Sequence, residues 1–159
     1  MFDKSQRSTF PYWFAHWCAF QMTALNHHMW KPKYLFHDWS KPWLKLLFSY
    51  KKVQTWHRNH NKHHPEWLER KLSTCHGSLA DVDYYDALYY LEFFDYEAMI
   101  IDWECSHFTK EASPRNAREE LKVFLKLDHV SKYPNLFSND EYLNMFKEKC
   151  NFVLNKRGF

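Results

Sequence analysis

Apolar residues recur at helical spacing along most of the chain, and this pattern predicts helices joined by short loops. The first apolar run begins after Ser8 or Thr9, either of which can cap a helix, and Pro11 fits its first turn. We expect this first helix to end within residues 26–30.

Prolines divide the next part of the chain. Pro32 begins a short segment, and Pro42 closes that segment while opening a third helix that extends to about Trp56. The histidine-rich stretch HRNHNKHHPE follows this helix. The longest apolar run covers residues 81–108 and predicts one central helix, with Asp81 or Asp83 as its cap.

Two more helices are expected after the central one, at residues 115–128 and 139–154, and Ser113 with Pro114 fits the start of the first. The chain contains 2 glycines, too few for the tight turns of an all-β fold. The 159 residues, 45% of them hydrophobic, suffice for one core. These patterns predict a compact, all-α single domain of about six helices that covers residues 1–159.

The four cysteines are widely spaced and include no CxxC pair, so we expect reduced thiols. They are Cys18, Cys75, Cys105 and Cys150. The N-terminal residues lack the basic and then apolar pattern of a signal peptide, and polar residues interrupt the aromatic segment that follows. We therefore expect a cytoplasmic protein without membrane association.

A formal net charge of +3, with lysines scattered among acids, gives no strong nucleic-acid signal. The charge is compatible with a small anionic substrate. The 11 histidines are more informative, because imidazole is the commonest metal ligand and a general acid or base near neutral pH.

The dipeptide His37-Asp38 is the sharpest local feature, because it follows an apolar approach and precedes Lys41. An adjacent imidazole and carboxylate can bind one divalent cation if other helices bring further ligands. The alternative is that both side chains only form hydrogen bonds near a helix end.

Asp102 lies within the apolar run of the predicted central helix, where a buried carboxylate needs a cation or hydrogen-bond donors to compensate it. A metal ion would compensate it well. The alternative is an exposed aspartate on a polar stripe beside Glu97 and Glu104. Asp95, seven residues earlier on the same face, is either an outer partner of such a site or a surface acid.

Four histidines fall within eight positions, namely His57, His60, His63 and His64. On a helix, the first, second and fourth of these share one face. Pro65 discourages helical geometry at the residue before it, so the helix could end there. A ligand, a phosphate contact or a proton-transfer role explains this density better than core packing does, although a solvated surface tract would show the same pattern.

His16, His37-Asp38 and Asp102 together resemble the H…HD…D pattern of the HD-domain superfamily, whose members are metal-dependent and mostly phosphohydrolases. The segments HDWSK, HRNHNKHHPEW and MIIDW are similar to those of an uncharacterised HD-like family found widely in phage and bacterial genomes. The motifs of that family are H, HDxSK, HxxxNxHHPE and EMxxDW. Here they span residues 16–103.

The resemblance implies an HD-like helical bundle that binds a divalent metal ion, which could be Mn, Mg, Co, Ni, Zn or Fe. The implied ligands are His16, His37, Asp38 and Asp102. The resemblance also implies a cleft lined by His57, Asn61, His63, His64 and Glu66. It places the protein in a bacterial or phage-infected host cytosol.

The sequence departs from the family pattern at two positions. Ala98 stands where the family has a glutamate, with Glu97 one position away, which puts any role of that acid in doubt. His60 has no counterpart in the pattern, so we expect it to be a bystander.

The first ligand has two rivals, His27 and His28, which are nearer to His37 in sequence than His16 is. His27 would lie about 16 Å beyond His16 on the same helix, so both cannot bind one ion. The family spacing favours His16, and we expect His28 in the turn between helices.

These observations lead to a hypothesis of a metal-dependent hydrolase of phosphate esters, with a nucleotide as the substrate. The metal would polarise a phosphoryl oxygen and activate a water molecule. Lys41 would neutralise phosphate charge, and His57, His63 or His64, with Glu66 beside them, would hold oxygens or protonate the leaving group. One of Trp39, Trp67 and Trp103 could stack on a base.

Two alternatives remain open at this point. One is a di-iron oxygenase with an HD fold, in which His57 and either His63 or His64 hold a second metal ion. The other is a non-catalytic module that binds a metal or a nucleotide. The sequence does not decide between a monomer and an oligomer.

Overall fold

The structure is a computed structural model that describes residues 1, 3, 6–75, 80–110, 115–126 and 130–159, apart from the side chains of residues 80–83. Among these residues the chain forms nine α-helices and two short 3-10 helices. The all-α prediction is confirmed, but the α-helices are more numerous than the predicted six. Two of the expected helices are broken, and the short helices at Pro65–Leu72 and Pro134–Phe137 were not expected.

The α-helices are α1 (Phe10–Asn26), α2 (Ser40–Leu44), α3 (Tyr50–His60), α4 (Pro65–Leu72), α5 (Ala80–Glu92), α6 (Tyr96–Thr109), α7 (Ala117–Phe124), α8 (Pro134–Phe137) and α9 (Asp140–Lys156). The 3-10 helices are η1 (Gln6–Ser8) and η2 (Pro32–Phe36). No helix in the described part of the chain is long and apolar enough to cross a membrane.

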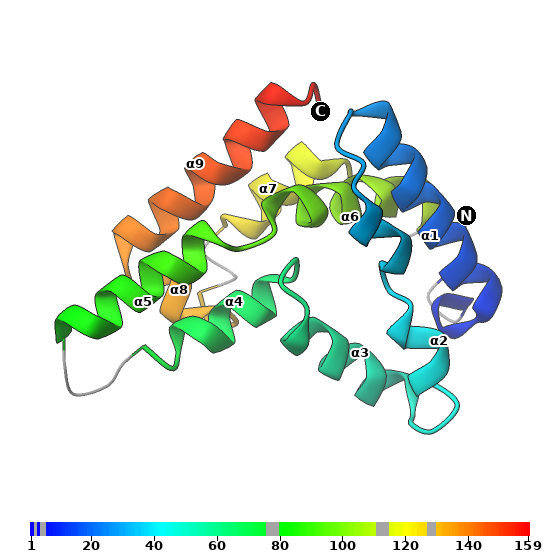
Figure 1. The fold of residues 1–159 in the computed structure, drawn as a ribbon, viewed down its shortest axis with the longest axis horizontal. Coiled ribbons are helices and arrows are strands. Elements are labelled where there is room, and N and C mark those ends of the chain that lie inside the picture. Colours follow the sequence, from blue (N-terminus) through cyan, green and yellow to red (C-terminus); the bar gives the residue numbers. More distant parts are fainter. Residues whose placement is uncertain (2, 4–5, 76–79, 111–114, 127–129) are drawn as a thin grey trace.

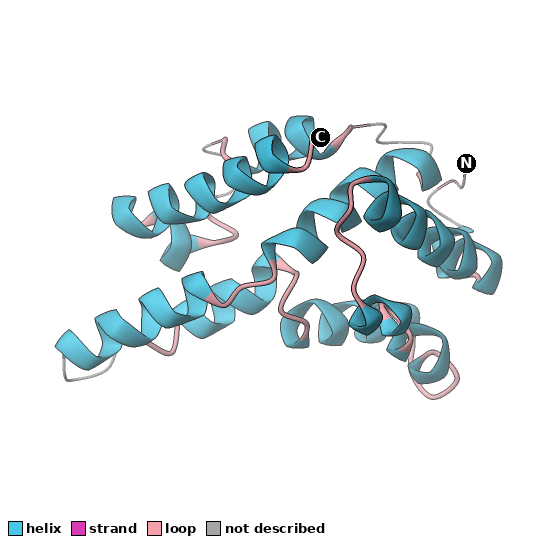
Figure 2. Ribbon diagram, turned by 45° about the horizontal axis from the view of Figure 1, so that its top comes forward, coloured by secondary structure: helices cyan, strands magenta, loops and turns pink. Residues whose placement is uncertain are grey.

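α6 is the central element of the fold. It lies between α1 on one flank and the pair α5 and α9 on the other (Figures 1 and 2), and both α1 and α9 pack against it. Met99, Ile100 and Ile101 of α6 are fully buried, as are Phe20 of α1 and Phe146 of α9. Burial of side chains of this size stabilises a fold by about 1.5–3 kcal/mol each.

The predicted boundaries of α1 are confirmed. The Thr9 hydroxyl accepts a hydrogen bond from the Tyr12 amide, Pro11 stands in the first turn, and the helix ends at Asn26. α9 likewise begins after Asn139, whose side chain accepts hydrogen bonds from the first turn.

The single central helix expected at residues 81–108 is wrong, because the chain breaks between α5 and α6. Asp95 is the reason: its side chain accepts a hydrogen bond from the Ala98 amide and caps α6. Asp95 also forms an ion pair with Lys33, so it is a cap near the surface rather than an outer partner of the predicted metal site. The proposed caps Asp81 and Asp83 lie outside the described side chains.

The continuous third helix expected from Pro42 to Trp56 is also wrong. Pro42 lies within α2, which ends at Leu44, and α3 begins only after Ser49. Leu46 and Leu47, which lie between the two helices, are each 77% exposed, so burial does not hold this segment in a helix.

The helix expected at residues 115–128 is shorter in the structure. Asn116 and Glu119 form a reciprocal capping box, so α7 begins at Ala117, and it ends at Phe124. The predicted start at Ser113 and Pro114 lies outside the described residues.

Candidate metal centre

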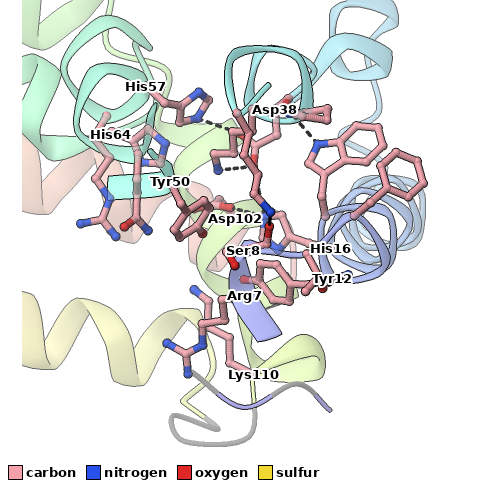
Figure 3. Close-up of a pocket in the computed structure, with 18 of the residues that line it drawn as sticks. Arg7, Ser8, Tyr12, His16, Asp38, Tyr50, His57, His64, Asp102 and Lys110 are labelled. Carbon is pink, nitrogen blue, oxygen red and sulfur yellow. Dashed lines mark hydrogen bonds and ion pairs between the residues drawn. The ribbon is translucent and has the colours of Figure 1, made fainter. Parts of the chain in front are cut away.

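Seven donor residues from separate elements meet at one place beside α6. They are His16 from α1, His37 and Asp38 from the turn after η2, His57 from α3, His63 and His64 from the connection between α3 and α4, and Asp102 from α6. Figure 3 shows the side chains of His16, Asp38, His57, His64 and Asp102 around this place.

The structure brings the four predicted ligands together. His16 Nε2 lies 2.9 Å from Asp102 Oδ1 and 3.6 Å from Asp38 Oδ2. His37 Nε2 lies 3.7 Å from both Asp38 Oδ1 and Asp102 Oδ1. Two ligands that each bind one transition metal ion at about 2.1 Å are roughly 3.0–3.4 Å apart, so most of these separations need only a small adjustment.

α1 directs His16 inward because the residue belongs to the buried face of that helix. Tyr12, His16 and Phe20 follow one another at four-residue spacing, and all three are buried. Phe20 also fixes a second donor, because its ring stacks on His37 with a centroid distance of 3.6 Å.

Asp38 has an uncommon backbone conformation, with a φ of 61°. Aspartate and asparagine tolerate this left-handed region better than most residues do. The Trp13 indole N–H donates a hydrogen bond of 3.0 Å to the Asp38 carbonyl, and Lys41 Nζ contacts the carboxylate Oδ2. The turn therefore holds the carboxylate in the centre of the cluster.

A second donor group shares Asp38 with the first. Asp38, His57, His63 and His64 each offer one ligand atom, and these atoms lie within 4.8 Å of one another. The helical face predicted for this histidine tract is only partly present: α3 ends at His60, so His63 and His64 reach the site from a loop.

Several buried donor atoms in this cluster lack a hydrogen-bond partner among the described residues. They are His37 Nε2, Asp38 Oδ1, His57 Nε2, His63 Nε2 and His64 Nε2. His57 Nε2 and Asp38 Oδ1 are 2.7 Å apart, but the pair does not have hydrogen-bond geometry. Buried polar atoms are seldom left without partners, so atoms that converge in this way are typical of a site that binds a cation.

The ring of His57 is held from its other side. The Asn61 amide nitrogen donates to the His57 carbonyl at 2.7 Å and lies 2.9 Å from His57 Nδ1. An Nδ1 atom that accepts from Asn61 leaves the imidazole proton on Nε2. Ligation of an ion by His57 Nε2 therefore requires that proton to leave.

Burial favours the neutral form of the histidines. Desolvation lowers the pKa of His16 despite the opposing effect of Asp102, and desolvation also lowers the pKa of His57. The pKa values of His63 and His64 are held well below the usual value for the same reason. Neutral imidazole is the form that binds metal ions.

The two aspartates favour the charged form. Burial alone would raise the pKa of Asp38, but the nearby His37, Lys41 and His57 outweigh burial and hold it well below its usual value. Hydrogen bonding with His16 has the same effect on the pKa of Asp102, again against the effect of burial. Carboxylates and neutral imidazoles together could hold a divalent metal ion, and this donor set suits transition metals better than Mg²⁺.

The remaining sequence candidates lie outside the donor cluster. His60 is exposed and its Nδ1 hydrogen-bonds to the Trp56 carbonyl, as expected for a bystander. Glu66 pairs with Lys132 at 3.1 Å, so it contacts a neighbouring basic residue instead of the donors. Glu97 pairs with Lys31 and Arg157 at the far end of α1.

Two cavities open onto the cluster. The first has a volume of about 350 Å³, includes His16, Asp38 and Asp102 in its wall, and carries the basic residues Arg7, Lys41, Lys45, Arg58 and Lys110. The second has a volume of about 380 Å³ and lies beside α7.

Trp103 lines the second cavity and Trp39 is 42% exposed, whereas Trp67 is buried in the core and is unsuited to stack on a base.

Sequence reasoning missed several residues of this region. Cys105 Sγ lies 3.6 Å from His16 Nδ1, and its position three residues after Asp102 on a helix was a usable signal. Arg7 and Lys110 carry no recognisable pattern, because they stand at the ends of elements that meet only in the folded chain.

The fold and the donor cluster define a helical protein with a candidate buried metal site of histidines and aspartates. Comparisons with models of known protein families, with curated proteins and with solved structures find no match.

Proposed function

We propose that the protein is an HD-like, metal-dependent phosphohydrolase that acts on a nucleotide or a related phosphate ester. The H…HD…D residues of the sequence pattern supply four of the clustered donors, which supports the resemblance. One observation carries the proposal: the first cavity opens onto the donor cluster, and Lys41, Lys45 and Arg58 bring positive charge to its wall. A phosphate bound there would meet both the donors and the positive charge.

In this proposal His16, His37, Asp38 and Asp102 hold a divalent transition metal ion. The bound ion would polarise a phosphoryl oxygen and activate water for attack. The chain itself orients the donors through the turn at Asp38 and the stacking of Phe20 on His37.

Basic and proton-carrying residues would act on the substrate from the cavity wall. Lys41 places a positive charge beside Asp38, and because it lines the cavity it could also contact a phosphate oxygen. His57, in the ring form that Asn61 favours, carries its proton on Nε2 at the cluster and could give that proton to a leaving group. His64 lines both cavities, and its neutral ring could hold a phosphate oxygen.

Phosphate release from nucleotides and cyclic nucleotides tests this proposal, with Mn, Co, Ni, Zn, Fe and Mg supplied in turn. Wild type should release phosphate with at least one transition metal, and the Asp38→Asn variant should not. Equal release by the two proteins under every condition would show that the proposal is wrong.

A di-iron oxygenase is the second candidate, and the donor group of Asp38, His57, His63 and His64 favours it. This group offers ligands for a second ion that shares Asp38 with the first. Metal analysis and an absorption spectrum of the protein as purified distinguish the two candidates. Two irons per chain with a charge-transfer band would support the oxygenase.

A further inference from the structure

The second cavity adjoins the first, and Asp102 and His64 line both. Five basic residues line it, namely Arg7, Arg58, Lys110, Arg115 and Lys132. The acidic residues in its wall are Glu66, Asp102 and Glu120, and Asp102 already belongs to the donor cluster. Outside the donor cluster, the wall therefore carries five basic residues and only two acidic ones.

Most of this basic charge is already paired. Glu66 pairs with Lys132 at 3.1 Å and with Arg58 at 3.6 Å, and Arg115 pairs with Glu120 at 3.0 Å. Arg7 and Lys110 remain, and neither has an ion pair with an acid among the described residues.

Arg7 and Lys110 are placed to bind one anion. Arg7 and Lys110 each line the two cavities. Figure 3 shows them next to each other, on the side of the site away from His57. Arg7 Nε is buried and has no hydrogen-bond partner in the described structure, while Lys110 Nζ is held by a 2.7 Å hydrogen bond to Ser106 Oγ. A buried guanidinium nitrogen of this kind is stabilised by an anionic oxygen.

We infer that Arg7 and Lys110 form a second anion subsite, and that the substrate therefore carries two phosphate groups. This inference rests on the proposed function for the first phosphate, which lies at the donor cluster. The first cavity has aromatic walls from Phe10, Tyr12 and Trp13, so the apolar part of the substrate lies there. The second phosphate then lies between Arg7 and Lys110.

Titration calorimetry tests the inference with nucleoside 3′,5′-bisphosphates and 5′-monophosphates of the four common bases. Wild type should bind at least one bisphosphate about tenfold more tightly than its monophosphate, because the second phosphate gains charge-assisted hydrogen bonds. Where the protein releases phosphate during the titration, the same ratio is taken from kcat/KM.

The combined change Arg7→Gln and Lys110→Gln should abolish the preference for the bisphosphate and leave monophosphate binding within twofold of wild type. Lys51→Gln with Lys52→Gln is the matched control, because these exposed lysines of α3 remove the same charge elsewhere and should keep the preference.

A wild-type protein that shows no preference for the bisphosphate with any base would overturn the inference. An Arg7 and Lys110 variant that retains the preference would overturn it as well. Equal loss of both ligands in that variant would instead place the two basic residues on the first phosphate. A protein that prefers the bisphosphate but never releases phosphate keeps the second subsite and refutes the proposed hydrolysis.

Discussion

Two histidines, His16 within α1 and His27 at the C-cap of the same helix, have opposite surroundings. His16 Nε2 lies 2.9 Å from Asp102 and belongs to the donor cluster. His27, eleven residues later, hydrogen-bonds through Nδ1 to the Arg157 carbonyl at 2.9 Å, and its ring stacks on Phe159 at 3.8 Å. Both residues were candidates for the first ligand, but only His16 meets other donors.

The comparison separates structural histidines from candidate ligands by the partners of their nitrogens. His27 fastens the C-terminus to the end of α1, and His28 next to it has a φ of 54° in the turn, as expected for a residue between helices. In the cluster, by contrast, ring nitrogens of His37, His63 and His64 are buried without hydrogen-bond partners in the described structure. A high density of histidine in a sequence does not show this difference.

Asp38→Asn should have the largest effect on metal binding, because both donor groups share Asp38. Asparagine tolerates the left-handed backbone at this position, so the variant should fold. A metal ion at 100 times its Kd stabilises wild type by about 2.7 kcal/mol, which raises Tm by roughly 5–10 °C for a chain of this size. We expect the variant to lose this shift in a thermal melt with Mn, Co, Ni or Zn.

Asp86→Asn is the control for that melt, because Asp86 is exposed on α5 and the charge change is the same. It should retain the full shift. If Asp38→Asn also retains it, the cluster does not hold the ion.

Asn61→Ala should have the next largest effect, on activity and not on metal binding. Asn61 donates to the carbonyl and Nδ1 of His57, which favours the ring form with its proton on Nε2, the proton that the proposed function gives to the leaving group. We expect phosphate release to slow by about tenfold or more, with an unchanged metal Kd by titration calorimetry. Asn59→Ala should leave both quantities unchanged, and an equal effect of the two changes on phosphate release would contradict the role of Asn61.

The fold was predictable where local signals decide it. The caps Thr9 and Asn139 fix the beginnings of α1 and α9, and both are visible in sequence. The break at Asp95 was missed because the apolar pattern continues through Phe93 and Phe94, and a single capping residue had to compete with that periodicity.

All seven donors of the site were named from the sequence, but their arrangement into two groups that share Asp38 was not. His16, His37, Asp38 and Asp102 were named because their order resembles a known pattern, and the structure places them together. The approach of His63 and His64 to Asp38 depends on a tertiary turn, which helical spacing alone could not predict.

His27→Ala tests the other side of the comparison. It removes one hydrogen bond and one aromatic stack, so we expect the free energy of unfolding to fall by roughly 1–2 kcal/mol, with unchanged metal affinity. Urea denaturation and titration calorimetry measure these two quantities. A loss of metal affinity would return His27 to the candidate ligands. His60→Ala should lower the free energy of unfolding less than His27→Ala does, because the His60 ring stacks on Trp56 at the surface.

Glu97→Gln should give the smallest change, at the same end of α1. Burial alone would raise the pKa of Glu97, but Lys31 and Arg157 outweigh burial and hold the pKa below its usual value. The charged form is therefore stabilising, fully so above the unfolded-state pKa of about 4.3, and this contribution is lost as pH falls through the folded-state pKa.

For these partly exposed ion pairs we expect a difference of about 0.5 kcal/mol between wild type and Glu97→Gln at pH 7, from urea denaturation. The difference should disappear in strong acid and shrink in high salt, because both conditions weaken the pairing of Glu97 with Lys31 and Arg157. Glu148→Gln, at an exposed position of α9, should show almost no difference at any pH. If the difference in unfolding free energy between wild type and Glu97→Gln grew as pH fell, the charged carboxylate would be destabilising. His27 would then hold the C-terminus to α1 without help from the ion pairs.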